Sequence, residues 1–218
     1  MNRRKLLSKI EIGESLYVEF KQRFSDYLKI AKEIIAFANT KGGVIIFGID
    51  DDGSIYGVES EKSETELIKE TFENFCEPKV NYEISYHSLE NKEIVCVEIP
   101  ESENKPHRIQ DYKSKLDINT AQVYIRVNDK SVPASKEMIK ILQSRSTEHT
   151  LKNYSIGKNE KIVFEYLREN DFISAKKLSA IANISTRRAS RTLINLVRAN
   201  ILAIHTKDDG EDYFTNLT

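Results

Sequence analysis

The chain has 218 residues, enough for one large domain or two modest ones, and its 39% hydrophobic residues can form a substantial core. Charged residues make up 31% of the chain, yet the net charge is −1, which excludes a strongly basic nucleic-acid-binding protein. Two cysteines exclude a disulfide framework, and no apolar run suits a signal peptide or a membrane span, so we expect a cytoplasmic protein.

The first half of the chain predicts alternating strands and helices. In 16–21 the residues Leu16, Val18 and Phe20 alternate with polar ones, so Glu19 and Lys21 should lie side by side on the other face of a strand. Residues 26–39 have the apolar spacing of a helix, and 44–49 are apolar at every position, which is typical of a strand buried on both faces.

Further elements complete this first domain. Ser63-Glu64-Thr65-Glu66 fits a capping box and predicts the start of a helix through about Phe75. The remaining elements expected are a turn at 52–53, a hairpin of strands 80–86 and 94–99, a strand at 122–127 and a helix capped by Ser135. The polar segment 100–114 is the best candidate for a mobile binding loop. Residues 1–146 are therefore predicted to form an α+β domain, a mixed sheet with flanking helices.

The pattern changes after a polar linker at 147–158. Residues 159–169, 174–182 and 185–199 predict three helices, the last two with serine N-caps. Residues 201–205 and 212–214 predict a two-stranded wing around the turn Lys207-Asp208-Asp209-Gly210. Three helices followed by such a hairpin resemble a winged helix-turn-helix domain, which we expect over 159–218.

The third of these helices carries the candidate nucleic-acid contacts. Residues 151–218 hold 11 Lys and Arg against 8 Asp and Glu, a formal charge of +3. In a helix-turn-helix the start of this helix reaches base edges and phosphates. The candidate residues are Thr186, Arg187, Arg188, Ser190, Arg191 and Asn195. The alternatives are a solvated helix face or a protein-docking surface.

Two blocks of the first domain resemble a known family. One is Ala36-Phe37-Ala38-Asn39-Thr40-Lys41-Gly42-Gly43, followed by an apolar strand and Asp50-Asp51-Asp52-Gly53; the other is Glu14-Ser15-Leu16-Tyr17-Val18-Glu19-Phe20-Lys21. With Gly57-Val58 and Val123-Tyr124-Ile125-Arg126, they resemble the AlbA-like domain of the Schlafen family over roughly residues 11–140. The Gly-x4-Gly-Lys-Ser/Thr pattern of a P-loop is missing.

The resemblance implies a carboxylate cluster. In Schlafen nucleases two glutamates at this spacing and a later aspartate are expected, which here are Glu14, Glu19 and Asp50, with Asp51 as the rival aspartate. The cluster would hold Mg²⁺ or Mn²⁺, and Lys21 would stabilise the charge of the phosphate. The structural alternative is that Glu14 and Glu19 pair with Lys21 or Arg126 in a polar network.

Two functions follow from these patterns. The first is a DNA-binding transcriptional regulator, in which the winged helix grips DNA. The second is a metal-dependent endoribonuclease of the Schlafen type that acts on structured RNA such as tRNA. The resemblance also implies a homodimer, because the animal Schlafen core joins two half-modules and this chain has one. We expect no membrane partner.

Overall fold

The computed structural model describes residues 1–145 and 155–217, which divide into two compact units, Met1–Pro133 and Ala134–Thr218. The first unit is built on a mixed four-stranded sheet in the order β1-β2-β5-β4, in which β1 and β2 are parallel and the other pairs antiparallel. Its elements are α1 (Arg3–Ile12), β1 (Val18–Lys21), α2 (Tyr27–Asn39), β2 (Gly42–Phe47), α3 (Glu61–Asn74), β3 (Cys76–Glu77), β4 (Glu83–Leu89), β5 (Lys92–Pro100), β6 (Arg108–Ile109), β7 (Tyr124–Val127) and β8 (Lys130–Pro133).

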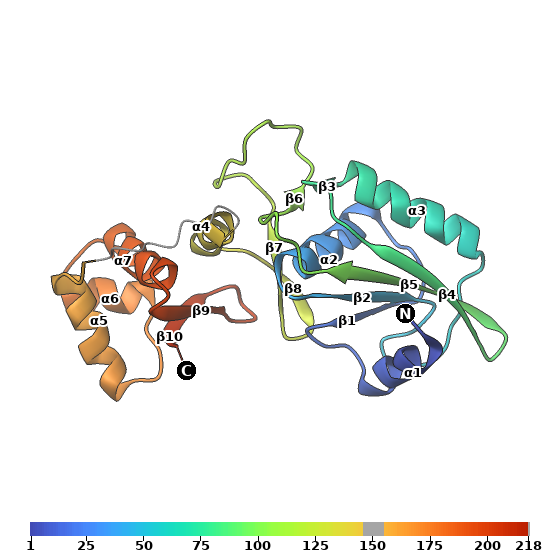
Figure 1. Cartoon of the computed structure of the whole chain (residues 1–218), viewed down its shortest axis with the longest axis horizontal. Helices are drawn as coiled ribbons and strands as arrows, with labels where there is room; N and C mark the ends of the chain where they lie inside the picture. Colours follow the sequence, from blue (N-terminus) through green and yellow to red (C-terminus); the bar gives the residue numbers. More distant parts are fainter. Residues whose placement is uncertain (146–154, 218) are drawn as a thin grey trace. The chain divides into compact units, whose positions relative to one another are not determined.

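Helices cover both faces of this sheet (Figure 1). One face packs under α2 and α3, where Ile34, Phe37, Phe47 and Val97 share one core. The opposite face carries α1, whose Leu6 is fully buried within the second core. Because β2 lies between these two layers, its side chains are apolar in both directions, as its continuous run of apolar residues predicted.

Several element boundaries differ from the sequence-based expectation. The α3 helix begins at Glu61, because Ser60 rather than Ser63 is its N-cap and accepts a hydrogen bond from the Ser63 amide. The β4 strand begins at Glu83 rather than residue 80, and Val80 is buried by side-chain packing instead of sheet pairing. Neither α1 nor β8 was expected from the sequence.

The segment 100–114 is more firmly anchored than its polar composition suggested. It contains β6, and residues 105–109 are buried. His107 lies with Nδ1 2.8 Å from the Pro78 carbonyl oxygen and Nε2 2.7 Å from Ser102 Oγ, while Asn39 Nδ2 donates to its carbonyl oxygen. Burial lowers the pKa of His107 below its ordinary range, as expected for a neutral histidine that holds a loop in place.

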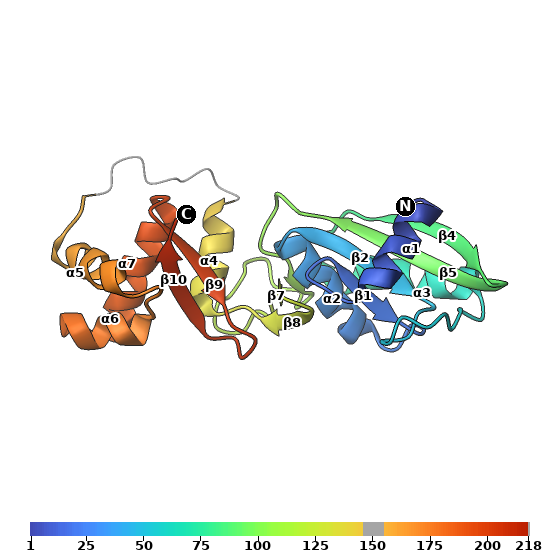
Figure 2. The same cartoon turned by 90° about the horizontal axis from the view of Figure 1, so that it is seen from below.

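The second unit consists of helices followed by a β-hairpin (Figure 2). Its elements are α4 (Lys136–Arg145), α5 (Lys158–Glu169), α6 (Ala175–Ala182), α7 (Thr186–Arg198), β9 (Leu202–Thr206) and β10 (Asp212–Asn216). Its core joins Val163, Leu178, Leu193 and Phe214 from α5, α6, α7 and β10. Ser174 and Ser185 cap α6 and α7, as the sequence predicted.

The α4 helix belongs to this second unit. The sequence placed it at the end of a first domain reaching residue 146, whereas in the structure it packs against α7. The expected linker at 147–158 falls mostly outside the described residues, and Lys158 already begins α5. No helix in the described ranges has the length and apolar character needed to cross a membrane.

Candidate functional site

Glu19 lies at the centre of a buried ionic cluster in the first unit. The alternation of β1 turns Val18 and Phe20 into the core and Glu19 toward the other face, where it is 7% exposed. Arg126 Nη1, from β7, donates to Glu19 Oε2 at 2.8 Å and to Glu33 Oε2, on α2, at 3.0 Å. Lys21 Nζ pairs with Glu19 Oε1. Together with Ser131, these four residues form what we call the Arg126 cluster.

Arg126 connects several elements through this cluster. Its side chain is fully buried, and Nη2 donates to the Ser15 carbonyl oxygen at 2.8 Å. Its guanidinium lies 4.6 Å from the centre of the Phe37 ring, and its backbone amide donates to Thr40 Oγ1. A buried charge is tolerated when it is paired and hydrogen-bonded in this way, so Arg126 fastens β7 to β1 and α2.

Glu33 is the member of the cluster whose pKa is raised. Burial raises its pKa above the ordinary value, and the nearby negative charge of Glu19 raises it further. Ser131 donates to Glu33, and Arg126 and Lys21 oppose the rise. Two carboxylates therefore share the charge of one buried guanidinium.

The other two expected metal ligands have different roles. Glu14 Oε1 accepts a hydrogen bond from the Phe20 amide at 3.0 Å, so it caps the open edge of β1. Burial raises the pKa of Glu14, and the charges of Glu19 and Asp51 add to the rise. Asp50 Oδ1 accepts from the Asp51 amide at 2.8 Å. The aspartate whose charge raises the pKa of Glu14 is thus Asp51, the rival aspartate named from the sequence.

These carboxylates do not have the arrangement that a bound metal ion needs. Mg²⁺ and Mn²⁺ require several oxygen ligands converging on one point. Within the residues that the structure describes, no three His, Cys, Asp or Glu side chains are placed to hold a metal ion. Glu19 is engaged by Arg126 and Lys21, Glu14 by a backbone amide and Asp50 by its neighbour. In this arrangement the three carboxylates make hydrogen bonds and ion pairs within the first unit.

A second candidate surface lies at the start of α7. The apolar side of this helix, including Ala189, Leu193 and Leu196, is buried in the core. The opposite side exposes Thr186, Arg187, Arg188 and Arg191, and Asn195 is half-buried. Five of the six residues named from the sequence therefore have exposed surface on or beside one helix face.

Three arginines of α7, Arg187, Arg188 and Arg191, line an open groove of about 1050 Å³. Lys158 and Asn159, at the start of α5, line the same groove. The lining holds four cationic side chains against one carboxylate, Glu160, which accepts a hydrogen bond from the Gly157 amide. We call this surface the arginine groove. Four clustered cations can contact successive phosphates of a nucleic-acid backbone.

Ser190 departs from the sequence-based interpretation. It is 5% exposed, and its hydroxyl donates to Glu137 on α4. Helical spacing placed Ser190 beside the arginines, but the expectation assigned α4 to the first domain, whereas in the structure α4 packs against α7 and covers Ser190. Conversely, Lys158 and Asn159 were missed, because only the tertiary fold brings the start of α5 to α7.

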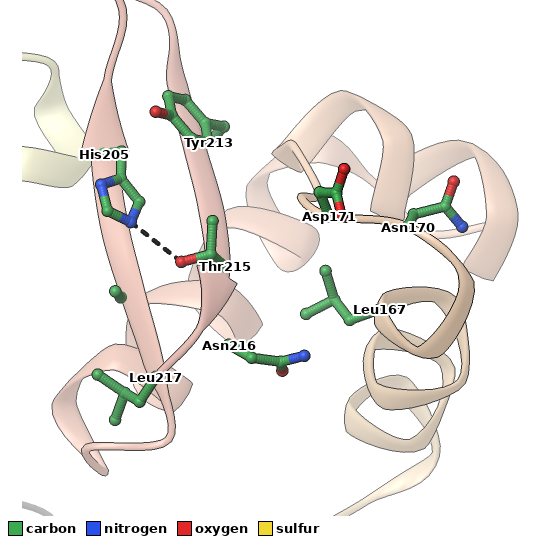
Figure 3. Close-up of a pocket in the computed structure, with 9 residues that line it drawn as sticks. Leu167, Asn170, Asp171, His205, Tyr213, Thr215, Asn216 and Leu217 are labelled. Atoms are coloured by element: carbon green, nitrogen blue, oxygen red, sulfur yellow. Dashed lines mark hydrogen bonds between the residues drawn. The ribbon is translucent and has the colours of Figure 1, made fainter.

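A smaller groove of about 500 Å³ lies between the end of α5 and the outer face of the β-hairpin (Figure 3). Leu167, Asn170 and Asp171 line it from α5 and the residues that follow it, and His205, Tyr213 and Thr215 from the hairpin. His205 Nε2 lies 3.0 Å from Thr215 Oγ1, and its ring stacks on Tyr213. No Lys or Arg is among its lining residues, so it contrasts with the arginine groove at the other end of α5.

Residues 14–135 match the family model described as Schlafen, AlbA_2, which covers more than half of the chain. The chain belongs to the Schlafen AlbA_2 family. The match contains Glu14, Glu19 and Arg126, and it ends before α4. The arginine groove therefore lies outside the segment that identifies the family.

Comparisons with individual proteins give similarity over part of the chain. An uncharacterized ATP-binding protein, UU034 of Ureaplasma parvum, is 38% identical over 87 residues, 37% of this chain, and the chain spans only 24% of that protein.

Two solved structures are similar to the chain. One is the N-terminal domain of an ATP-dependent DNA helicase RecG-related protein from Nitrosomonas europaea (24% identity, 51% of this chain, 81% of that chain, TM-score 0.40). The other is the DIP2311 protein from Corynebacterium diphtheriae (14% identity, 98% of this chain, 39% of that chain, TM-score 0.47).

Proposed function

We propose that this chain is a DNA-binding transcriptional regulator whose second unit is a winged helix-turn-helix. The order of α5, α6, α7 and the β9–β10 hairpin supports this interpretation. In such a domain α7 would be the recognition helix and the hairpin the wing. The first unit, which belongs to the Schlafen AlbA_2 family, would then serve for assembly or regulation.

The observation that carries the proposal is the arginine groove. Arg187, Arg188 and Arg191 are exposed, and the structure gives them no ion pair with any described residue. No acidic residue occurs between Asp171 and Lys207 in the sequence, so no carboxylate on α6 or α7 neutralises them. Unpaired arginines that line an open groove suit phosphate and base contacts rather than internal stabilisation.

The test is a salt titration of DNA binding. The triple variant Arg187→Ala/Arg188→Ala/Arg191→Ala should bind a labelled duplex at least about tenfold more weakly. The slope of log affinity against log salt should also fall by about 0.9 for each phosphate that the variant can no longer neutralise. Fluorescence anisotropy with a mixed-sequence duplex measures both quantities.

A charge-matched control separates local contacts from overall charge. The variant Arg3→Ala/Arg4→Ala/Lys5→Ala removes three exposed cations from α1 in the first unit. It should keep the salt slope of the unchanged protein. If both triple variants lose the same affinity, binding is nonspecific attraction and the recognition-helix proposal fails.

The second candidate function is a metal-dependent endoribonuclease acting on tRNA-like RNA with Mg²⁺ or Mn²⁺. It is favoured by the electrostatic proximity of Glu14, Glu19, Lys21 and Asp51. We rank this function second because Glu14 and Glu19 already have hydrogen-bond or ion-pair partners within the protein. Incubation with tRNA and Mn²⁺ tests it: cleavage that disappears in Glu14→Gln and persists in Asp50→Asn would support an active centre at Glu14.

A further inference from the structure

The two edge strands of the four-stranded sheet, β1 and β4, differ in whether their outward backbone groups have hydrogen-bond partners. On β1 the Phe20 amide is capped by Glu14, and Ser15 and Val18 exchange backbone hydrogen bonds across the edge. The opposite edge is β4, a strand of seven residues. It contains no Lys and no Pro, the residues that commonly keep an edge strand from pairing with another chain.

The hydrogen-bond pattern identifies the free backbone groups of β4. The Glu93 carbonyl oxygen accepts from the Val58 amide, so the backbone of Glu93 points away from β4. In an antiparallel pair, hydrogen-bonded and non-hydrogen-bonded positions alternate. Because Ser88 lies opposite Glu93, the amides and carbonyls of Ser88, Tyr86 and Ile84 point outward from the sheet.

These outward groups have no partner within the described residues. No hydrogen bond outside the β4–β5 ladder involves the backbone of these three residues. The side chains of β4 leave the edge open as well, because they lie on the two faces of the sheet. Tyr86 is 48% exposed, and its hydroxyl lies 3.1 Å from Thr65 Oγ1 on α3. Ser85 points to the other face, toward Met1. Three successive unpaired amide–carbonyl sets are a template for another strand.

We propose that β4 is a homodimer interface, in which two copies pair antiparallel about a two-fold axis at Tyr86. In this register Ile84 of one copy lies opposite Ser88 of the second copy, and the two Tyr86 residues lie opposite each other. All three are hydrogen-bonded positions, so every outward amide and carbonyl finds a partner. The two sheets would become one eight-stranded sheet.

The side chains that meet in this register agree with a second copy as the partner. Glu83 is the one charged residue of β4, and it would face Leu89 of the second copy rather than another carboxylate. The two Tyr86 rings would lie side by side on the α3 face, and cross-strand aromatic pairs are favourable. The interface is isologous, as a two-fold dimer requires.

A site-directed crosslink tests the register. Opposite residues of a hydrogen-bonded pair have Cα atoms about 5.5 Å apart, inside the range of roughly 4.4–6.8 Å that a disulfide spans. Tyr86→Cys should therefore form a disulfide-linked dimer under mild oxidation. Glu83→Cys is the matched control, because its two copies would lie about 20 Å apart along the strands. Native Cys76 and Cys96 are buried, and burial raises the pKa of both thiols to about 12, so they should not compete.

The oligomeric state gives the second, independent test. Sedimentation of the full chain across the micromolar range should show a mass rising from 25.1 kDa toward twice that value. Ser88→Pro removes an outward amide without breaking the β4–β5 ladder and should lower dimer formation at least tenfold, whereas Ser88→Ala should not. A monomeric mass, a dimer unaffected by Ser88→Pro, or equal crosslinking of the two cysteine variants would each overturn the proposal. These outcomes do not depend on DNA binding.

Discussion

Arg126 and the arginines of α7 show the same side chain in opposite settings. Arg126 is fully buried, with two carboxylates, a hydroxyl, a backbone carbonyl and an aromatic ring around it. Arg187, Arg188 and Arg191 are exposed along a groove. The first setting uses the guanidinium to stabilise the fold, and the second leaves it available for a ligand.

The residues that we expect to determine stability and those that we expect to bind nucleic acid therefore lie in different parts of the chain. Substitutions in the Arg126 cluster should act on the free energy of unfolding, and substitutions in the arginine groove should act on nucleic-acid affinity. The family match follows the first set of residues and ends before the second. Membership of the Schlafen AlbA_2 family therefore describes the first unit, and the proposed DNA contacts depend on the second.

The largest expected effect is that of Arg126→Ala. It leaves Glu19 and Glu33 buried without their guanidinium partner, which should lower the free energy of unfolding of the first unit by about 3–5 kcal/mol. Arg187→Ala, an exposed arginine, should change stability by no more than about 0.5 kcal/mol. Urea unfolding followed by circular dichroism compares the two. Similar losses in both variants would contradict the distinction.

A smaller effect is expected for Ser190→Ala. The change removes the hydrogen bond to Glu137 and should cost about 1 kcal/mol of stability. Because Ser190 is buried under α4, duplex affinity and its salt slope should remain unchanged. Thr186→Ala, an exposed neighbour on α7, is the matched comparison and should affect binding more than stability. A loss of affinity in Ser190→Ala without a loss of stability would restore Ser190 to the interface.

Glu33 should make the Arg126 cluster sensitive to pH. Its folded-state pKa is raised above the ordinary value of 4.5, so its contribution to stability is full below the unfolded-state pKa and is lost as pH rises through the folded-state pKa. Relative to Glu33→Gln, the unchanged protein should therefore lose stability as pH rises upward from about 4.5. Thermal melts across this range, with exposed Glu66→Gln as reference, measure the trend. A difference that stays constant with pH would contradict it.

The smallest effect is expected from metal ions. Because Glu19 is already paired with Arg126 and Lys21, Mn²⁺ should not raise the melting temperature in a way that depends on Glu19. Melts of the unchanged protein and Glu19→Gln, with and without Mn²⁺, provide the measurement. A stabilisation present in the first and absent in the second would show that the carboxylates rearrange around a metal, and would favour the nuclease function.

Local patterns predicted much of the fold. The alternation of 16–21 placed Glu19 beside Lys21, and the apolar run of 44–49 anticipated a strand covered on both faces. Ser174 and Ser185 were identified as N-caps, because a cap depends on a few neighbouring residues. The structural alternative to a metal site was a polar network in which Glu14 and Glu19 pair with Lys21 or Arg126. The structure contains this network for Glu19, whereas Glu14 accepts a hydrogen bond from the Phe20 amide instead.

The remaining features depend on contacts between distant residues. Glu33 joins Arg126 across 93 positions, and no spacing rule links the two. Lys158 reaches the arginine groove through packing of α5 near α7. His107 lies in the segment 100–114 that was expected to be a mobile loop, and its contacts with Asn39 and Pro78 hold it in place. In each case the role of a polar residue depends on contacts with an element distant in the sequence, which local sequence patterns do not predict.

The position of α4 has a practical consequence for fragments of this protein. Ile139 and Leu142 are buried, and Ser135 donates to Asp212 on β10 while Glu137 accepts from Ser190. A fragment of the second unit cut at residue 147 would discard this helix and expose the apolar and polar surfaces that it covers. One that starts at Ala134 keeps the unit intact and is the better choice for expression, crystallisation and selection of binding sites.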